Sequence, residues 1–279
     1  MANGYESNIP TGRPPAVTAW GTQVVAGTSH VLSSSFVEII ASTSFAAERV
    51  RVTISNTGAA NTNTDALLNL YTGAVSSETN WIMGLMAGWS GTVSTQKIFD
   101  FPVSLPAGTR IIAKSQALVG SQSLYVWIEL FEEGKAFGNA VESLGVDTTN
   151  SRGTSVTPGG AAEGSATAIG TSANAWNYVL VGVQGNADTS LLDNTQALDI
   201  CVGGTPVTNC SDFYQLNSTV ELNNVITPGR NCSIAASTAL QLRGQSSDAT
   251  VEAKYYALYG IYGTGTQAPA PGNMSGGMQ

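Results

Sequence analysis

Alternation of apolar and polar residues in short runs is the dominant pattern along this chain. In residues 49–55, Val50, Val52 and Ile54 fall on one face, and arginine and threonine fall on the other. This two-residue period predicts an antiparallel strand with one buried face. Residues 178–183 (YVLVGV) are apolar on both faces, so here we expect a strand that is covered on both sides.

Turn-forming residues separate these runs. Clusters of Gly, Asn, Asp, Ser and Thr occupy residues 56–65, 184–194 and 201–210. Short strands at intervals of roughly 8–15 residues, without helical periodicity, are typical of sandwiches and jelly rolls. The sequence therefore predicts an all-β chain of antiparallel β-sandwich (jelly-roll-like) domains.

Similar segments recur in the same order in the two halves, which predicts an internal duplication. The strands predicted at 49–55 and 178–183 take the same place in their halves. Each half also holds a proline-glycine turn and closes with an aromatic strand. The other matched segments are 68–73 with 198–203, 105–113 with 226–235, 114–118 with 236–240, and 125–131 with 256–262.

The duplication divides the chain into two tandem domains, flanked and joined by segments of different composition. The proline-rich start reads as an extended arm, and the tail, rich in Gly, Pro and Ala, as a flexible segment. The predicted parts are the N-terminal arm 1–19, β-sandwich domain 1 at 20–133, a linker at 134–155, β-sandwich domain 2 at 156–263 and the tail 264–279.

Composition supports a folded chain with few helices. Charged residues make up 11% and hydrophobic residues 42%, with a net charge of −8. A chain disordered by charge is excluded, since such chains combine low hydrophobicity with high net charge. Because acids outnumber bases and no Lys/Arg cluster occurs, we expect no binding to nucleic acid. No apolar run reaches the ~20 residues that span a bilayer, and no secretory signal is recognisable at the start, so we expect a product made in the cytoplasm, without membrane contact.

The residues that most often perform catalysis are scarce. The chain has one His and three Cys, and no nucleophile-elbow, P-loop or metalloprotease motif. We expect no enzymatic activity, no cofactor and no bound metal. The remaining catalytic candidates are His30, and loop carboxylates such as Asp188, Asp193 and Asp199, for which a role in turns is the simpler interpretation.

The cysteines leave two interpretations open. Cys201 and Cys210 are separated by the loop sequence VGGTPVTN and form a candidate disulfide. The alternative is that they and Cys232 are buried free thiols, which behave as small hydrophobic residues.

Four large side chains are candidates for contacts with other molecules. Trp81 and Trp89 flank a short apolar run that contains Met83 and Met86. Trp and Met are enriched both in cores and at subunit interfaces, and exposed Trp side chains can stack on sugars. The four residues are therefore candidates for core or subunit packing, or for glycan contact.

The segment 99–111, FDFPVSLPAGTRI, within a chain rich in Ser, Thr, Ala and Gly, resembles virion structural proteins of tailed bacteriophages. The resemblance covers the first half well and the second half loosely. It implies a part of the phage particle with tandem jelly-roll or sandwich domains, without a cofactor. Such proteins include capsid decoration (cement) proteins and tail or fibre proteins.

From the resemblance, the duplication and the acidic charge we predict a non-enzymatic decoration protein on the outer head surface. Its expected partners are further copies of itself, as a homotrimer, and the major capsid protein or other virion proteins. A tail, baseplate or fibre component that contacts host surface glycans is the alternative. A third hypothesis is an enzyme that acts on cell-wall polysaccharide through loop carboxylates.

Overall fold

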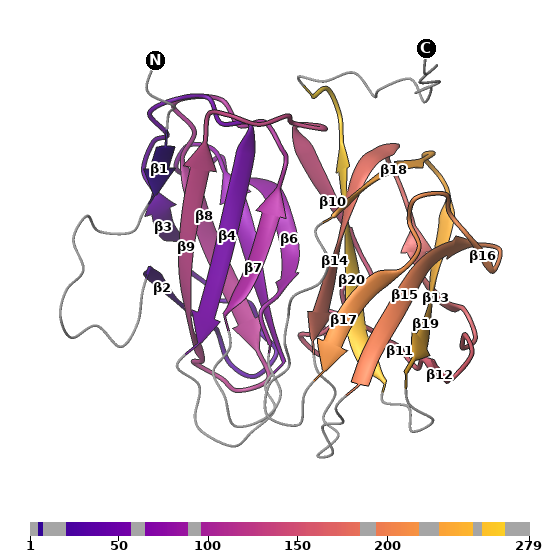
Figure 1. Cartoon of the computed structure of the whole chain (residues 1–279). Coiled ribbons are helices and arrows are strands. Elements are labelled where there is room, and N and C mark those ends of the chain that lie inside the picture. Colours follow the sequence, from indigo (N-terminus) through magenta and orange to yellow (C-terminus); the bar gives the residue numbers. More distant parts are fainter. Residues whose placement is uncertain are drawn as a thin grey trace, which may run out of the picture.

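The computed structural model describes residues 5–7, 21–56, 65–88, 96–184, 194–217, 229–247 and 253–265. These residues form strands β1 to β20, and none of them is helical. The strands make four sheets that pack as two sandwiches side by side (Figure 1). The predicted all-β fold with two antiparallel sandwiches is confirmed.

The first sandwich consists of two sheets, named here after their inner strands. In the β9 sheet the order is β2-β9-β4-β7, with β1 also paired to β9; in the β8 sheet it is β3-β8-β5-β6. The strands are β1 (Tyr5–Ser7), β2 (Thr22–Val25), β3 (Val37–Ile40), β4 (Arg49–Asn56), β5 (Ala66–Thr72), β6 (Thr79–Met86), β7 (Lys97–Phe101), β8 (Ile111–Ala117) and β9 (Ser123–Phe131).

The second sandwich is built in the same way. Its β20 sheet has the order β10-β20-β14-β18, with β11 also on β20, and its β19 sheet is centred on β19 and β15. The strands are β10 (Ala140–Leu144), β11 (Thr154–Val156), β12 (Gly159–Gly160), β13 (Thr167–Thr171), β14 (Trp176–Gln184), β15 (Asn194–Val202), β16 (Thr205–Pro206), β17 (Phe213–Asn217), β18 (Arg230–Ile234), β19 (Ala239–Ser246) and β20 (Lys254–Tyr262).

The two sandwiches share one strand order. The sequence β2-β9-β4-β7 corresponds to β11-β20-β14-β18, and β3-β8-β5-β6 corresponds to β13-β19-β15-β17. Two four-stranded sheets in this order form a jelly roll. In both copies a short preceding strand extends the same edge, because β1 lies beyond β2 along β9 as β10 lies beyond β11 along β20.

This correspondence confirms some of the matched segments and corrects others. Segments 68–73 and 198–203 lie at β5 and β15, and segments 125–131 and 256–262 lie in β9 and β20. The proline-glycine match is wrong, because 105–113 leads into β8, whereas the described part of 226–235 forms β18, the counterpart of β7. The match of 114–118 with 236–240 compares the end of β8 with the start of β19. A proline-glycine turn suits several connections of a jelly roll, so it does not identify one of them.

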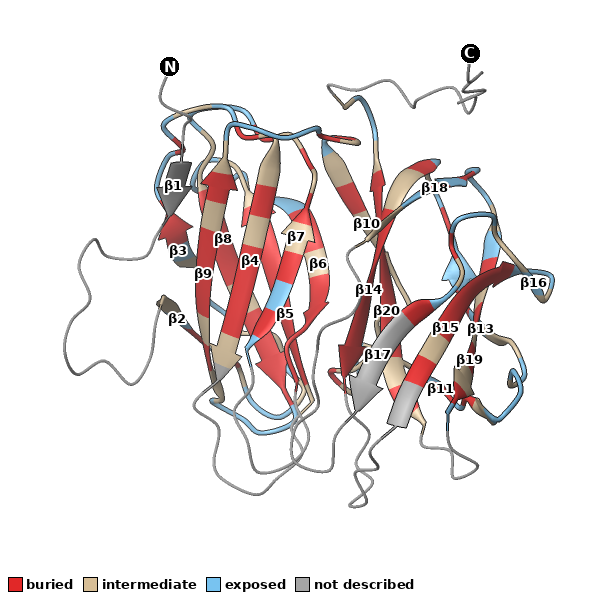
Figure 2. Ribbon diagram, viewed as in Figure 1, coloured by how far each residue is buried: buried red, intermediate tan, exposed pale blue. Residues whose placement is uncertain are grey.

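The half-buried strand predicted at 49–55 is present as β4. Val50, Val52 and Ile54 are 0–1% exposed and belong to the core of the first sandwich. On the other face Arg49 and Arg51 are half-buried, whereas Thr53 is only 2% exposed, so this face is more covered than the pattern predicts. Figure 2 shows burial running almost unbroken along β14. The prediction of a strand covered on both sides at 178–183 is therefore confirmed.

The β20 sheet is buried on both faces because it serves both sandwiches. Val179, Val181 and Leu258 point into the core of the second sandwich. Leu180, Tyr259 and the neighbouring apolar residues of the opposite face join the core of the first. The two jelly rolls are therefore joined through a continuous apolar core.

Tyr259 is central to this junction. Its ring makes edge contacts with Phe99 and Phe101 of β7, at centroid distances of 5.7 and 6.1 Å. Its hydroxyl accepts a hydrogen bond from the amide of Met86 and donates one to the carbonyl of Gly84, both at 2.9 Å. The side chain thus connects the edge strands β6 and β7 of the first sandwich to the middle of the β20 sheet.

The segments predicted outside the domains are partly strands. In the N-terminal arm, Tyr5–Ser7 pair with β9 as β1, and residues 1–4 and 8–19 lie outside the described residues. The predicted linker 134–155 instead contains β10 and the start of β11, which belong to the second sandwich. Polar residues dominate this segment because β10 is a short edge strand with few positions facing the core. The tail from residue 266 onward lies outside the described residues.

Candidate ligand cleft

A cleft of about 790 Å³ opens at one end of the first sandwich. Its walls come from the connections β3–β4, β5–β6 and β7–β8, together with Trp81 of β6 and Asn139, which immediately precedes β10. This end lies near the starts of β4 and β10, at the top of Figure 1. The contributing segments are residues 41–42, 72–75, 104–106 and 108–110.

The β7–β8 connection carries the PAGTR sequence and is held by its own hydrogen bonds. The hydroxyl groups of Thr43 and Thr109 donate to the carbonyl of Pro106 at 2.9 and 2.7 Å. The amide of Gly108 donates to the carbonyl of Thr43 at 2.8 Å, and Gly108 has a positive φ of 77°. Glycine adopts this conformation without strain, so the loop closes tightly and one wall of the cleft is fixed.

Arg110 ends this connection and is neutralised by two carboxylates. Its guanidinium lies 2.7 Å from the carboxylate of Glu38 and 3.6 Å from that of Glu78. The pKa of Glu78 is lowered, because its carboxylate accepts backbone hydrogen bonds from its own residue and from Ser76, and because Arg110 is near. The group around Arg110 carries a net charge of −1, but Arg110 alone of the three lines the cleft, and its Nη1 has no hydrogen-bond partner among the described residues.

Trp81 separates the cleft from the core. It is 7% exposed, belongs to the apolar core and lines the cleft. Its indole Nε1 is buried and has no hydrogen-bond partner among the described residues. Buried indole N–H groups normally find an acceptor, so this N–H is an exception, and because its nitrogen is closed to solvent a ligand in the cleft does not reach it.

The other predicted contact residues lie where the two sandwiches meet. Met86 is fully buried, and the carbonyl of Met83 accepts a hydrogen bond from the hydroxyl of Ser143 in β10 at 2.6 Å. Met86 therefore packs within the chain and presents no surface for a glycan, whereas the side chain of Met83 is half-buried. Trp89 lies outside the described residues.

The predicted disulfide between Cys201 and Cys210 is wrong. The structure joins Cys210 to Cys232, with a Cα–Cα distance of 6.0 Å, and leaves Cys201 as a buried free thiol. Cys201 lies on β15, whereas Cys210 follows β16 and faces β18 in the second core. The short loop between Cys201 and Cys210 does not bring their sulfur atoms together, because the pleat of the strands and the packing of the sheets decide which side chains meet.

A buried polar cluster joins the sandwiches at another place. The Nζ of Lys97 donates to the carbonyl of Val183 at 2.6 Å, and burial lowers the pKa of Lys97 to about 7. Gln184 donates to the carboxylate of Asp65, whose pKa is raised by burial, and accepts from the amide of Gly88 at 3.2 Å. These contacts satisfy the polar groups at the junction.

The structure describes two of the catalytic candidates, His30 and Asp199, and they have different hydrogen-bond partners. His30 contacts the hydroxyl of Ser151 at 3.1 Å, but Ser151 is 0% exposed and no substrate reaches it. Asp199 accepts hydrogen bonds from Arg243 at 3.3 Å and from the amide of Asp212 at 2.8 Å. Asp188 and Asp193 lie outside the described residues.

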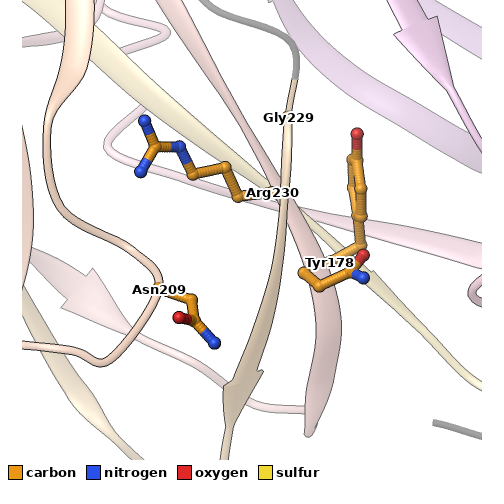
Figure 3. A pocket seen from close by; sticks show the side chains of 5 residues that line it. Tyr178, Asn209, Gly229 and Arg230 are labelled. Carbon is orange, nitrogen blue, oxygen red and sulfur yellow. The ribbon is translucent and has the colours of Figure 1, made fainter. Parts of the chain in front are cut away.

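A second hollow, of about 460 Å³, lies beside β18 in the second sandwich (Figure 3). The guanidinium of Arg230 donates to the carbonyls of Ser211 and Asp212, and burial raises the pKa of Tyr178 to about 12. Figure 3 shows the side chains of Tyr178 and Arg230 extending in different directions. Because its strongest donor is already used, this hollow is the weaker candidate.

Within the described ranges, no group of three or more His, Cys, Asp or Glu side chains is placed to hold a metal ion. In the same part of the chain no helix has the length and hydropathy needed to cross a membrane.

No model of a known protein family matches the sequence, and no curated protein matches it. Solved structures similar to this chain include that of PNGF-II, at 9% identity and a TM-score of 0.41, over 93% of this chain and 66% of that chain. They also include that of Sulfolobus Turreted Icosahedral Virus, at 12% identity and a TM-score of 0.35, over 92% of this chain and 90% of that one. Both scores are low, and neither likeness assigns a function.

Proposed function

We propose that this chain is a non-enzymatic structural protein of a virus particle, and specifically a decoration protein on the outer head surface of a tailed bacteriophage. The observation that carries the proposal is the continuous core between two jelly rolls of identical strand order. Such a core makes the chain one rigid block rather than two hinged modules. Jelly rolls are a recurrent architecture of capsid domains, and a rigid block suits a stabilising role.

Composition supports assembly. Only 11% of the residues are charged, and charged residues are depleted at the centres of protein interfaces, where their desolvation is costly. A chain with few charged residues has fewer charges to desolvate when its surface packs against neighbours. We propose a homotrimer that binds the major capsid protein.

The charge favours the outside of the head. The net charge is −8, and packaged DNA is a dense polyanion that repels an acidic protein. A protein on the outer surface avoids this repulsion.

The test is to locate the protein in particles that carry it. Purified particles are examined by mass spectrometry and cryo-electron microscopy, and native mass spectrometry gives the oligomeric state. Trimeric density on the outer face of the head is expected. Density at the tail tip would overturn the decoration role, and absence from particles would overturn any role in the virion.

A tail, baseplate or fibre component that contacts glycans is the second candidate. The cleft beside Trp81 favours it, because a hollow with one fixed wall offers a host glycan a place to bind. The same density maps separate the two candidates.

A further inference from the structure

We propose that the outer edge of β2 pairs with β2 of a second copy of this chain, antiparallel and about a two-fold axis at Val24. The strand β2 lies at an edge of the β9 sheet and, among the described strands, pairs with β9 alone (Figure 1). This contact goes beyond the proposed function, which brings three copies together. A trimer that also makes the two-fold contact becomes a hexamer.

The backbone of β2 directs the polar groups of two residues away from the sheet. The amide of Ala26 donates to the carbonyl of Gln122 at 2.8 Å and continues the register of β2 on β9. Because ladder bonds alternate along an antiparallel pair, Val24 also bonds toward β9, whereas Gln23 and Val25 direct their amides and carbonyls outward. Among the described residues no backbone group pairs with these outward groups. Such an edge is a template for a further strand.

The edge of β2 has none of the usual protection against pairing. Edge strands are commonly protected by charged side chains, proline or bulges. The sequence of β2 is TQVV, and its register with β9 is regular. The edge strand β3 of the other sheet, in contrast, carries Glu38 and a register shift next to it, and β1 carries Glu6. A partner strand therefore meets no charge or bulge on β2.

One register uses all the outward groups of both copies. Gly21, with a φ of 89°, ends the extended backbone on one side of β2. On the other side the carbonyl of Gly27 already accepts from the amide of Ser121 at 2.8 Å. Gln23 of each copy therefore faces Val25 of the other. Each facing pair exchanges an amide and a carbonyl bond, and the contact is self-complementary, as a two-fold interface requires.

Apolar side chains gather next to this edge. Val25, Val31, Leu118 and Val119 are four of the seven large apolar side chains that are exposed in the described part of the chain. The turns that carry them are joined, because the hydroxyl of Ser29 donates to the carbonyl of Leu118 at 2.7 Å. Exposed apolar patches mark interaction sites, and turns that are already fixed lose little conformational entropy on binding.

The absence of charge explains why another acidic copy can be the partner. The net charge of the chain is −8, so two copies repel each other. Residues 21–37 and 115–128, which include β2 and the turns beside it, contain no Lys, Arg, Asp or Glu. The contact thus brings no like charges together, and an uncharged, apolar centre is typical of homodimer interfaces.

Native mass spectrometry and analytical ultracentrifugation of the purified full chain test the contact. An even number of copies is expected: a dimer or, together with the proposed trimer, a hexamer. A monomer at every concentration, or a trimer alone, would overturn the two-fold contact. A dimer alone would support it and contradict the trimer, so the two proposals fail independently.

Two variants and a matched control connect the association to β2. Val25→Lys puts a charge into the apolar contact, next to the equivalent charge of the other copy, and is expected to weaken association by about 10-fold or more. Gln23→Pro removes an outward amide without removing a bond to β9, and is expected to have a similar effect. Val202→Lys, at a valine of similar exposure in the second sandwich, is expected to leave association unchanged.

Circular dichroism and thermal unfolding show whether the variants fold. If folded Val25→Lys and Gln23→Pro proteins associate as well as the wild type, the contact is wrong. Equal weakening by Val202→Lys would overturn it as well, because the effect would then come from added charge anywhere on the surface.

A pair of cysteine variants tests the register. A mixture of Gln23→Cys and Val25→Cys proteins, oxidised with oxidised glutathione, is expected to form disulfide-linked dimers. Facing residues of a hydrogen-bonded pair lie about 5.5 Å apart between Cα atoms, which is within disulfide reach. Each variant alone is expected to form far fewer. Dimers that form equally well from one variant alone would overturn the axis at Val24.

Discussion

The β9 sheet and the β20 sheet have the same strand order, but the faces that point away from their own sandwich cores carry different side chains. At one position of this face, Arg51 of β4 pairs with Glu129 of β9, and their side chains approach to 4.0 Å. At the corresponding position, Leu180 of β14 pairs with Tyr259 of β20, and both lie in the shared core. At this position a charged pair on the β9 sheet is replaced by an apolar pair on the β20 sheet, whereas the neighbouring pair of the β9 sheet, Thr53 and Trp127, is also buried.

The difference teaches that the backbone arrangement of a jelly roll leaves the role of its outer face open. Both sheets bury their inner faces in the same way, as Val50 and Val179 show. The side chains of the outer face decide whether the sheet faces outward or receives another sandwich. In this chain the two jelly rolls are unequal parts of one block.

Exchanging the chemistry of the two faces gives the largest expected effect. Tyr259→Glu puts a charge into the shared core and is expected to cost more than about 4 kcal/mol, so the protein unfolds or fails to fold. Glu129→Tyr, at the corresponding position of the β9 sheet, is expected to change stability by less than about 1 kcal/mol. Urea unfolding measures both, and equal losses would show that the faces are equivalent.

The buried amine of Lys97, which reaches from β7 to the carbonyl of Val183 in β14, gives the junction a pH dependence. Lys97 has a pKa of about 7 when folded, against 10.5 when unfolded. Between these values the unfolded chain binds more protons, so the free energy of unfolding rises with pH, by on the order of 1 kcal/mol per pH unit.

The matched variant for this prediction is Lys97→Met. Subtracting its unfolding free energies from those of the wild type at each pH removes the contribution of the other groups. The difference is expected to rise from neutral to alkaline pH, and parallel curves would mean that Lys97 titrates alike in both states.

Removing one hydroxyl tests the polar contact within the shared core. Tyr259→Phe leaves the amide of Met86 and the carbonyl of Gly84 without this partner and is expected to cost about 1–3 kcal/mol. Tyr125→Phe, on the half-buried outer face of β9, is expected to cost less than about 0.5 kcal/mol. Thermal unfolding compares the two variants, and a cost that is the same for both would contradict the bridging role.

The smallest effect is expected at the edge of the β9 sheet. Deleting residues 1–7 removes β1, which pairs with only three residues of β9, from Glu129 to Phe131. We expect a loss below about 1 kcal/mol, since the partner strand keeps β4 on its other side. A larger loss of unfolding free energy in urea would contradict this and would show that β1 contributes substantially to the stability of the first sandwich.

Strand identity and the contrast between the sheets could be predicted from the sequence. The pattern at 49–55 indicates one buried face and that at 178–183 indicates two. The pattern does not say what covers the second face, because the partners, Phe99 and Phe101, lie far away in the chain.

Register was the main obstacle to a finer prediction. Aligning the aromatic strands from Tyr125 and Tyr256 is one residue out, because Val126 is the residue of β9 that corresponds to Tyr256: Val126 pairs with Ile54, and Tyr256 with Val183. A slip of one residue exchanges the two faces of a strand. The Cys210–Cys232 bond and the position of β10 likewise depend on which strands pair and in which register, and the sequence alone does not show this.

The candidate cleft was only partly foreseen. Trp81 was a candidate for contact, and its burial beside a hollow could not be read from an apolar run. The PAGTR segment carries the resemblance to phage virion proteins, and the structure places it in a wall of the cleft. No sequence pattern marks Asn139 as a residue of the cleft, since its position depends on β10 joining the second sandwich.

The shared core has a consequence for biosynthesis. Tyr259 lies in β20, the last of the described strands, so the ribosome completes the first sandwich long before its apolar side can be covered. Phe99, Phe101 and Met86 stay unprotected during that interval, and hydrophobic surface of this kind promotes aggregation and chaperone binding. We expect the first half to need β20 before its apolar side is covered.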